Sequence, residues 1–359
     1  MTLKELMDIN IIYPDRKIYD SAKDRWDHIA KPIDGLGDLE KIICRICAIQ
    51  GKVLPDISKK ALIIMCADNG VVCENITQTG QGVTASVAHL MAERQSSVCI
   101  MTKDYPLDIF PVDIGIASDE TINGIINRKV AMGTGNILRE PAMSSEQCLK
   151  AVNTGIDIVR DCSEKGYGLI ATGEMGIGNT TTSTALCCAL TGQKPESITG
   201  RGAGLSDEGL RRKTQVICEA LIRHGLAENE CPDKEYAFNA LSKVGGLDIA
   251  GLAGVFIGGA IYHIPVLIDG FISAVAAYCA QMMVPGSVAY MIASHTGKEK
   301  GTGVVLNRLG LKAVIDADLS LGEGTGAVLL LPMLDMSMAL YREGIVFSDT
   351  DIEEYKRYK

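Results

Sequence analysis

The sequence predicts an α/β fold in which a parallel sheet carries helices on both faces. Continuous apolar runs, as a strand buried on both faces requires, alternate with segments of helical periodicity. Repeated strand–helix units of this kind predict a doubly wound sheet with right-handed crossovers. The five runs are KALIIMCAD (60–68), LDIFPVDIG (107–115), GYGLIATGE (166–174), IPVLIDGF (264–271) and KAVIDADL (312–319).

The two ends of the chain lie outside this alternating pattern. Residues 1–30 contain two polar, amphipathic pieces, and residues 331–359 contain one amphipathic helix, a turn and a charged tail. We expect the two ends to pack together as a small helical domain, beside a large sheet-containing domain of residues 31–330.

Composition and charge exclude several classes of protein. With 359 residues, 47% hydrophobic and 22% charged, the chain has the composition of an ordinary globular protein. The formal net charge is −9 and lysine and arginine do not cluster, so we expect no nucleic-acid partner. The longest apolar run, 249–262, is shorter than the roughly 20 residues that span a bilayer, so it predicts a buried helix and no membrane partner.

The cysteines predict a reducing compartment. Twelve cysteines lack the regular spacing of a disulfide framework and no signal peptide precedes them, so we expect the protein in the cytoplasm. Cys44 and Cys47 form a CxxC, but no second pair or nearby histidine completes a ligand set. Buried core thiols are therefore favoured over a redox or metal site.

Polar or glycine-rich turns follow all five apolar runs. In a doubly wound sheet, ligands bind beyond the carboxyl ends of the strands, so five such turns predict one shared cleft. The turns are Asp68-Asn69-Gly70, Asp113-Ile114-Gly115, Gly173-Glu174-Met175-Gly176, Asp269-Gly270 and Gly322-Glu323-Gly324.

Two further glycine-rich segments are typical of phosphate binding. GEMGIGNTTTS (173–183) offers converging backbone N–H groups at a helix start and predicts an anion cradle, although a capped helix is an alternative. Neither a P-loop nor the dinucleotide fingerprint is present. In TGRGAGLSDEGLRRK (199–213), Lys213 is a candidate phosphate counter-charge, with a solvated surface lysine as the alternative.

A third turn, ASHTGKEKGTG (293–303), contains Ser294 and His295, and a lone histidine is more often structural than catalytic.

Glu323 is a candidate general base because its glycine neighbours leave its carboxylate as the one reactive group on an open loop. The local alternative is a cap for the helix that follows, which the chemistry of this segment alone favours. Together with Glu174 and the phosphate cradles, Glu323 indicates proton removal beside a bound phosphorylated ligand.

The ordered motifs resemble the nicotinate-nucleotide:dimethylbenzimidazole phosphoribosyltransferase family over roughly residues 30–345. They are DNGV at 68, GEMGIGNTT at 173, GRGAGLSDEGLRRK at 200, GGLDIAGLAG at 245, VLIDGF at 266, ASHTGKEKG at 293 and LSLGEGTGA at 319. The resemblance implies a Rossmann-like large domain, a small helical domain from both chain ends, and a homodimer or a heterodimer with a paralogue.

The implied reaction transfers the phosphoribosyl group of β-nicotinate mononucleotide to a base, as a step toward the lower ligand of cobamides. It needs no cofactor and no metal. Glu323 is implied as the base, and Glu174 as a second catalytic residue. The donor site is expected at Gly176, Gly178, Asn179, Thr180, Gly202, Lys213, Ser294 and Gly297, and the acceptor pocket at Asp68, Asn69, Thr77, Thr84 and Ser86.

Departures from the family pattern lie at positions expected around the acceptor: Asn69, Ser86, Ala203, Gly297 and Ser320. They raise the alternative that a phenol or p-cresol is the acceptor, possibly with a paralogous subunit. Two further alternatives are a non-catalytic subunit of a paired enzyme and a nucleotide-dependent dehydrogenase. Retention of Glu323, Glu174 and Lys213 argues against the first, and the absent dinucleotide fingerprint against the second.

Overall fold

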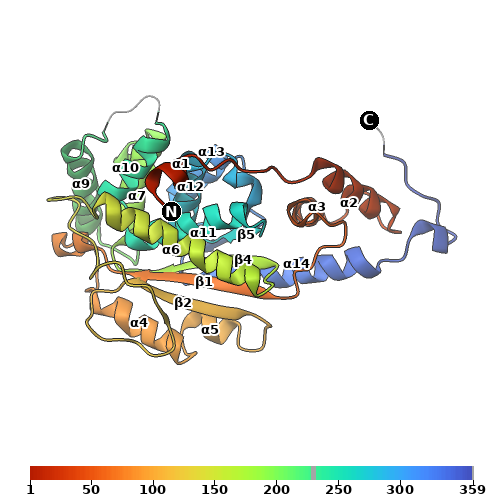
Figure 1. Cartoon of the computed structure of the whole chain (residues 1–359), viewed down its shortest axis with the longest axis horizontal. Coiled ribbons are helices and arrows are strands. Elements are labelled where there is room, and N and C mark those ends of the chain that lie inside the picture. The colour runs from red at the N-terminus through yellow and green to blue at the C-terminus, as the bar shows by residue number, and fades with distance from the viewer. Residues whose placement is uncertain (228–231, 358–359) are drawn as a thin grey trace.

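The computed structural model describes residues 1–227 and 232–357, and its centre is a six-stranded parallel sheet (Figure 1). The strand order β3-β2-β1-β4-β5-β6 runs outward in both directions from the β1–β4 pair. The predicted Rossmann-like sheet is confirmed. Its strands are β1 (Lys60–Ala67), β2 (Asp108–Gly115), β3 (Ile126–Asn127), β4 (Leu169–Met175), β5 (Val266–Ile268) and β6 (Met291–Ala293).

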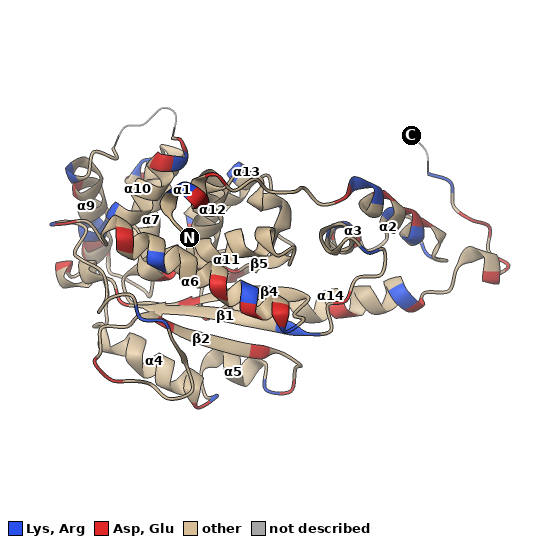
Figure 2. Ribbon diagram, viewed as in Figure 1, with Lys and Arg blue, Asp and Glu red and all other residues tan. Residues whose placement is uncertain are grey.

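Helices cover both faces of this sheet, and Figure 2 places most charged residues on the helices and loops around it. The described α-helices are α1 (Leu3–Met7), α2 (Arg16–His28), α3 (Asp38–Gln50), α4 (Gly82–Ala92), α5 (Ser97–Met101), α6 (Ser145–Glu164), α7 (Asn179–Thr191), α8 (Pro195–Ile198), α9 (Asp207–Arg223), α10 (Lys234–Val244), α11 (Leu247–Ile261), α12 (Phe271–Met283), α13 (Lys300–Leu309) and α14 (Thr325–Glu343).

Strand β1 shows how the sequence forms a sheet that is buried on both faces. Successive side chains of a strand point to opposite faces, and in β1 both sets are apolar and fully buried from Ala61 to Ala67. Ile63 and Met65 pack into the core under α6, α11 and α12, while Leu62 and Ile64 pack into the core with α4 and α14. A strand buried on both faces cannot alternate with polar residues, which is why the run is continuous.

Four of the five predicted runs form strands of the main sheet, and the fifth prediction is wrong. Residues 312–319 contribute β8 (Ile315–Leu319), which pairs only with β7 (His295–Gly297) in a separate two-stranded sheet. Asp316 and Asp318 are exposed, so this segment is not the doubly buried strand that the apolar run suggested. The short strands β3 and β6 were not predicted.

The apolar run 249–262 forms α11, a helix buried between the sheet and α6, as predicted. The two helices approach so closely that a Cβ on Gly254 would lie 2.0 Å from the Val152 carbonyl oxygen. Glycine at this crossing is therefore required by close approach. In the part of the chain that the structure describes, no helix is long and apolar enough to cross a membrane.

The helices from both chain ends meet at one end of the molecule (Figure 1). The rings of Trp26 in α2 and Tyr341 in α14 lie 4.9 Å apart, and the Arg25 guanidinium donates to the Tyr341 carbonyl at 3.0 Å. Two details differ from the predicted division. Helix α14 crosses the 330/331 boundary, and α1 lies beside α6, where Asn153 donates to the Met1 carbonyl at 2.7 Å. A separate terminal domain stays a prediction.

Cys44 and Cys47 are buried core thiols in α3, as predicted. Burial raises the pKa of the Cys44 thiol to about 12 and that of Cys47 to about 11. Among residues 1–227 and 232–357, no group of three or more histidine, cysteine, aspartate or glutamate side chains is placed to hold a metal ion.

Candidate active site

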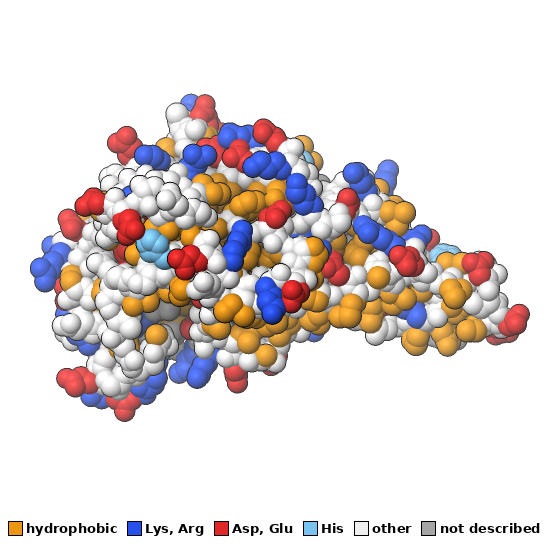
Figure 3. Space-filling model, turned by 90° about the horizontal axis from the view of Figure 1, so that it is seen from below, with side chains coloured by type: hydrophobic (Ala, Val, Ile, Leu, Met, Phe, Trp, Pro, Cys, Tyr) orange, Lys and Arg blue, Asp and Glu red, His pale blue; other side chains and the backbone are white. Residues whose placement is uncertain are grey.

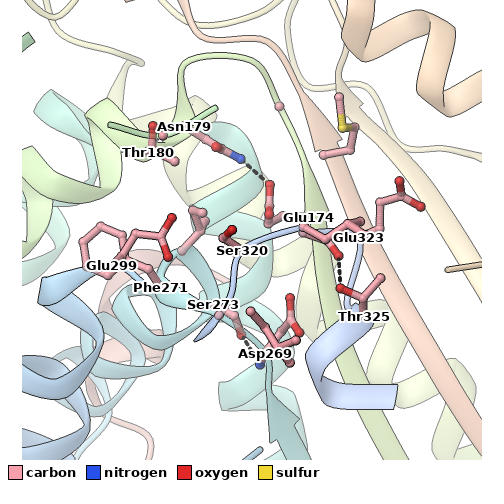
Figure 4. A pocket seen from close by; sticks show the side chains of 18 of the residues that line it. Glu174, Asn179, Thr180, Asp269, Phe271, Ser273, Glu299, Ser320, Glu323 and Thr325 are labelled. Atoms are coloured by element: carbon pink, nitrogen blue, oxygen red, sulfur yellow. Dashed lines mark hydrogen bonds between the residues drawn. The ribbon is translucent and has the colours of Figure 1, made fainter. Parts of the chain in front are cut away.

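A cavity of about 220 Å³ opens beyond the carboxyl ends of β4 and β5 and is covered by the loop that precedes α14 (Figure 4). It adjoins a smaller cavity of about 90 Å³ beside α9. Residues predicted for the site line the larger cavity, namely Glu174, Gly176, Asn179, Thr180, Gly202 and Glu323. Gly178, Thr77 and Lys213 line the smaller one. The two cavities share the 176–180 turn.

The loop that carries Glu323 has an unusual backbone. Gly322, Glu323 and Gly324 all have positive φ, at 90°, 57° and 83°. This region is free for glycine but costs a residue with a Cβ on the order of 1 kcal/mol. A strained residue of this kind, held on the wall of a cavity, is typical of a functional position.

Two backbone contacts hold this loop against the end of β4. The Glu323 N–H donates to the Glu174 carbonyl at 3.2 Å. A Cβ on Gly173 would lie 2.8 Å from the Glu323 carbonyl, so a side chain at position 173 would displace the loop. The end of β4 and the loop that carries Glu323 are therefore fixed relative to each other.

The Glu323 side chain does not cap the helix that follows it. Helix α14 begins after Gly324, and in its first turn the Ala327 N–H donates to Asp269 Oδ1 at 2.9 Å, so that alternative is wrong. Instead, the Glu323 carboxylate accepts a hydrogen bond from the Val98 N–H, 3.1 Å away in the first turn of α5. The carboxylate is buried on the cavity wall and held from a segment more than 200 residues distant in sequence.

Glu174 belongs to a buried cluster of carboxyl groups. The Asn179 amide donates both to the Glu174 carboxyl group (Figure 4) and, over 3.0 Å, to that of Asp248. Burial, reinforced by the negative charge of Asp248, raises the pKa of Glu174 to about 8. A carboxyl group with this pKa is mostly protonated at neutral pH. Burial likewise raises the pKa of Asp269 on the cavity wall to about 6.

The turn 176–180 and Lys213 form one corner of the two cavities, called the anion-binding corner because a helix start and a buried ammonium group suit an anion. Helix α7 begins after Gly178, whose φ of 93° suits glycine, and its first residues line both cavities. The Lys213 ammonium donates to the Thr180 hydroxyl at 2.8 Å. Lys213 is only 1% exposed, so the surface-lysine alternative is wrong. Burial lowers its pKa to about 8, against a smaller opposing effect of Glu299.

Ser294 and Gly297 do not line the larger cavity. The Ser294 hydroxyl donates to the Ile268 carbonyl at 2.6 Å and hydrogen-bonds His295 Nδ1 at 2.9 Å. It is His295 that reaches the cavity wall, and burial lowers its pKa. Donor binding by Ser294 and Gly297 stays a prediction.

Three of the residues predicted for the acceptor pocket lie behind the 176–180 turn. The Asn69 amide donates to the Ile177 carbonyl at 3.3 Å, and the Thr84 hydroxyl accepts from the Ile177 N–H at 3.2 Å. Asp68 is buried and accepts from the Ala117 N–H at 2.8 Å. The Asn69 and Thr84 contacts brace the 176–180 turn from behind, whereas the Asp68 carboxylate holds the segment after β2.

The other two predicted acceptor residues lie apart from each other. Thr77 reaches the smaller cavity, whereas Ser86 is exposed and donates to the Gly82 carbonyl of its own helix at 3.0 Å. Acceptor binding by any of the five stays a prediction.

The expectation of one cleft shared by all five strand-end turns needs a correction. The turns at Glu174, Asp269 and Glu323 meet around the larger cavity, but those at Asp68 and Asp113 do not line it. Asp113 instead pairs with Lys129 at 3.2 Å. In the strand order, β1 and β2 lie on the side of β4 away from β5, whereas the cavity lies at the ends of β4 and β5.

Sequence reasoning gave no role to Asp248, Glu299 and Phe271. Glu299 and Phe271 line the cavity, while Asp248 acts from behind Asn179. Asp248 lies in the GGLDIAGLAG motif, which was the one signal that pointed to it.

A helix start and a buried lysine beside a cluster of carboxyl groups, at the ends of parallel strands, are typical of an enzyme that transfers a group from a phosphorylated substrate. A family model described as phosphoribosyltransferase matches residues 11–352. The chain belongs to this family and is an enzyme of the phosphoribosyltransferase class.

Several similar proteins carry the same name. Nicotinate-nucleotide–dimethylbenzimidazole phosphoribosyltransferase of Acetivibrio thermocellus is 42% identical over 356 residues, which cover 99% of each chain. The protein of that name from Clostridium acetobutylicum is 42% identical over 345 residues, or 96% of each. The crystal structure of CobT from Thermus thermophilus superimposes with a TM-score of 0.87 at 33% identity, over 94% of this chain and 100% of that one. The resemblance inferred from the motifs is confirmed.

Proposed function

We propose that the enzyme transfers the phosphoribosyl group of nicotinate mononucleotide to a ring nitrogen of dimethylbenzimidazole or a closely related base. The bond from the ribose C1′ to the pyridinium nitrogen breaks, a C1′–N bond to the acceptor forms, nicotinate leaves, and the acceptor proton passes to Glu323. The product is the riboside phosphate of a cobamide lower ligand. The observation that carries the proposal is Glu323 beside the anion-binding corner in one cavity.

The charges around the cavity suit this reaction. The pyridinium leaves as a neutral ring, so the leaving group needs no general acid. Positive charge develops on the ribose ring, and the carboxyl groups of Asp269, Glu299 and Glu323 surround the place where it forms. Lys213 and the start of α7 provide the complementary positive end for the 5′-phosphate.

An acceptor panel tests the proposed function. With nicotinate mononucleotide as donor, we expect kcat/KM for dimethylbenzimidazole to exceed those for adenine, phenol and p-cresol, measured by release of nicotinate. Of the departures from the family pattern, Ala203 and Ser320 line the cavity and Ser86 and Gly297 do not. Preference for phenol or p-cresol would overturn the acceptor assignment, and no turnover with any base would overturn the function.

We further propose that two copies of the chain associate through α14. Leu329, Met336 and Leu340 are exposed and spaced as one face of this helix. In Figure 3 hydrophobic side chains gather along the narrow end of the molecule. A surface of this kind is typical of an interface between subunits.

Light scattering tests this association. The Met336→Glu variant is expected to have half the mass of the wild-type particle because a charge would be buried at the interface. Ile222→Glu, at an equally exposed apolar position on α9, is the control and should keep the wild-type mass. A monomeric wild-type protein, or a dimeric Met336→Glu variant, would contradict the proposal.

We also propose a cytoplasmic location. The eleven cysteines that the structure describes are free thiols, which a reducing compartment preserves. Recovery of the protein in a secreted or membrane fraction after cell fractionation would contradict it.

A further inference from the structure

We propose that Asp248 is a positioning residue of this enzyme, which acts through the Asn179 amide to orient the Glu174 carboxyl group. The catalytic part of the proposal rests on the proposed function. The Asn179 amide nitrogen donates to the Glu174 carboxyl group at the end of β4 and to Asp248 Oδ2, 3.0 Å away at the start of α11. One amide group thus bridges carboxyl groups from two elements.

The surroundings of Asp248 fix its orientation. Its side chain is fully buried, and its second oxygen accepts from the Ile249 N–H at 3.0 Å. A Cβ on Gly246 would lie 2.4 Å from Asp248 Oδ1, and one on Gly176 would lie 2.9 Å from Oδ2. Backbone therefore encloses the carboxylate on both sides. Asp248 does not line the cavity, so it acts on the site through the Asn179 hydrogen bond and through its charge near Glu174.

The charges around the pair determine which group holds the proton. Glu174 is buried and faces Asp248, Asp269 and Glu299, and its pKa rises to about 8. Asp248 faces Asp68, but hydrogen bonds from Asn179 and the Ile249 N–H favour its anion, so burial raises its pKa only to about 6. The Cys66 thiol on β1 also faces both carboxyl groups and stays neutral because burial raises its pKa.

At neutral pH, Asp248 therefore carries the charge and Glu174 carries the proton. This distribution of charge and proton suits the proposed reaction. A neutral Glu174 limits repulsion among the carboxyl groups of the cavity, and the cationic ring of bound nicotinate mononucleotide favours the ionisation of Glu174. Removing the Asp248 charge changes the protonation of Glu174 without touching the substrate.

Infrared difference spectra of the whole enzyme test the protonation directly and without turnover. The carbonyl band of the protonated Glu174 carboxyl group is assigned by its loss in Glu174→Gln. In the wild type we expect this band to disappear near pH 8. In Asp248→Asn the lost negative charge should move the disappearance down by about 1 pH unit. In Asn179→Ala the pH at which the band disappears should rise, because the Asn179 hydrogen bond lowers the pKa of Glu174. Bands that do not move in these opposite directions would overturn the role of Asp248.

A double-mutant cycle tests the positioning. The side chain of the Asp248→Asn variant would offer one acceptor oxygen to two donors, the Ile249 N–H and the Asn179 amide, so Asn179 would turn away from Glu174. We expect Asp248→Asn to lower kcat/KM by about tenfold or more in the wild type and by less than about threefold in the Asn179→Ala background. Equal losses in both backgrounds would overturn the positioning role.

Asp113→Asn is the matched control. Asp113 is also a buried carboxylate at a strand end, accepting from the Ile116 N–H at 2.9 Å, but it does not contact Asn179. This variant should lower thermal stability and leave both the Glu174 band and kcat/KM unchanged. A wild type inert with every base would overturn the proposed function alone, because the infrared titration would still decide the relation between Asp248 and Glu174.

Discussion

Replacing Glu323 by glutamine is expected to lower kcat by about 10²–10⁴-fold while leaving the dissociation constant of nicotinate mononucleotide within about twofold. A glutamine amide cannot take the acceptor proton. It keeps the shape of the side chain, and its oxygen can still accept from the Val98 N–H that now holds the carboxylate. Nicotinate release measures kcat, and calorimetry measures donor binding.

The exposed Glu343, at the far end of the same helix, provides the control for this variant. Glu343→Gln makes the same chemical change and should turn over at the wild-type rate. Near-normal turnover by Glu323→Gln would exclude Glu323 as the base. A large loss of donor affinity would show that the residue acts in binding instead.

Replacing Lys213 by alanine is expected to weaken binding of nicotinate mononucleotide by about 10–100-fold, since a buried ammonium that bonds a phosphate is worth about 1.5–3 kcal/mol. Lys213→Met, which retains most of the side-chain volume, should weaken it similarly. Loss with alanine but not with methionine would assign the effect to packing. The exposed Arg211 on the same helix is the control, and Arg211→Ala should bind the donor as the wild type does.

The wild type should also bind the donor less tightly as pH rises through about 8. Lys213 is a cation below its pKa of about 8 and a neutral amine above it, so its attraction for the phosphate is present at low pH and lost at high pH. The Lys213→Met variant should lose this part of the pH dependence. An identical pH profile in wild type and variant would reject Lys213 as the phosphate counter-charge.

Sequence patterns predicted the sheet well where burial alone determines the pattern. Strand β1 lies between two helical layers, so its apolar run is continuous and unambiguous. The run 312–319 is similar in composition but forms an exposed strand outside the main sheet. The spacing of apolar residues does not distinguish a strand of the main sheet from an exposed strand, because Asp316 and Asp318 are compatible with either. Strand β6, with three residues, was too short to give a pattern.

The sequence predicted the site residues that share one turn. It did not predict the contacts between residues that are distant in sequence. Gly176, Asn179 and Thr180 occupy one turn, so their convergence follows from the sequence. Val98 holds Glu323, and Asp248 shares Asn179 with Glu174, through contacts between distant segments. The spacing of these residues along the sequence does not predict such contacts, because the residues meet only when the sheet and its helices pack.

Helix α14 also connects the reaction site to the periphery mechanically. Its first turn follows directly on Glu323, and its last turn is anchored where Tyr341 meets Arg25 and Trp26. Helix α2 contributes nothing to the cavity wall, yet through α14 it helps to fix the position of the loop that carries Glu323.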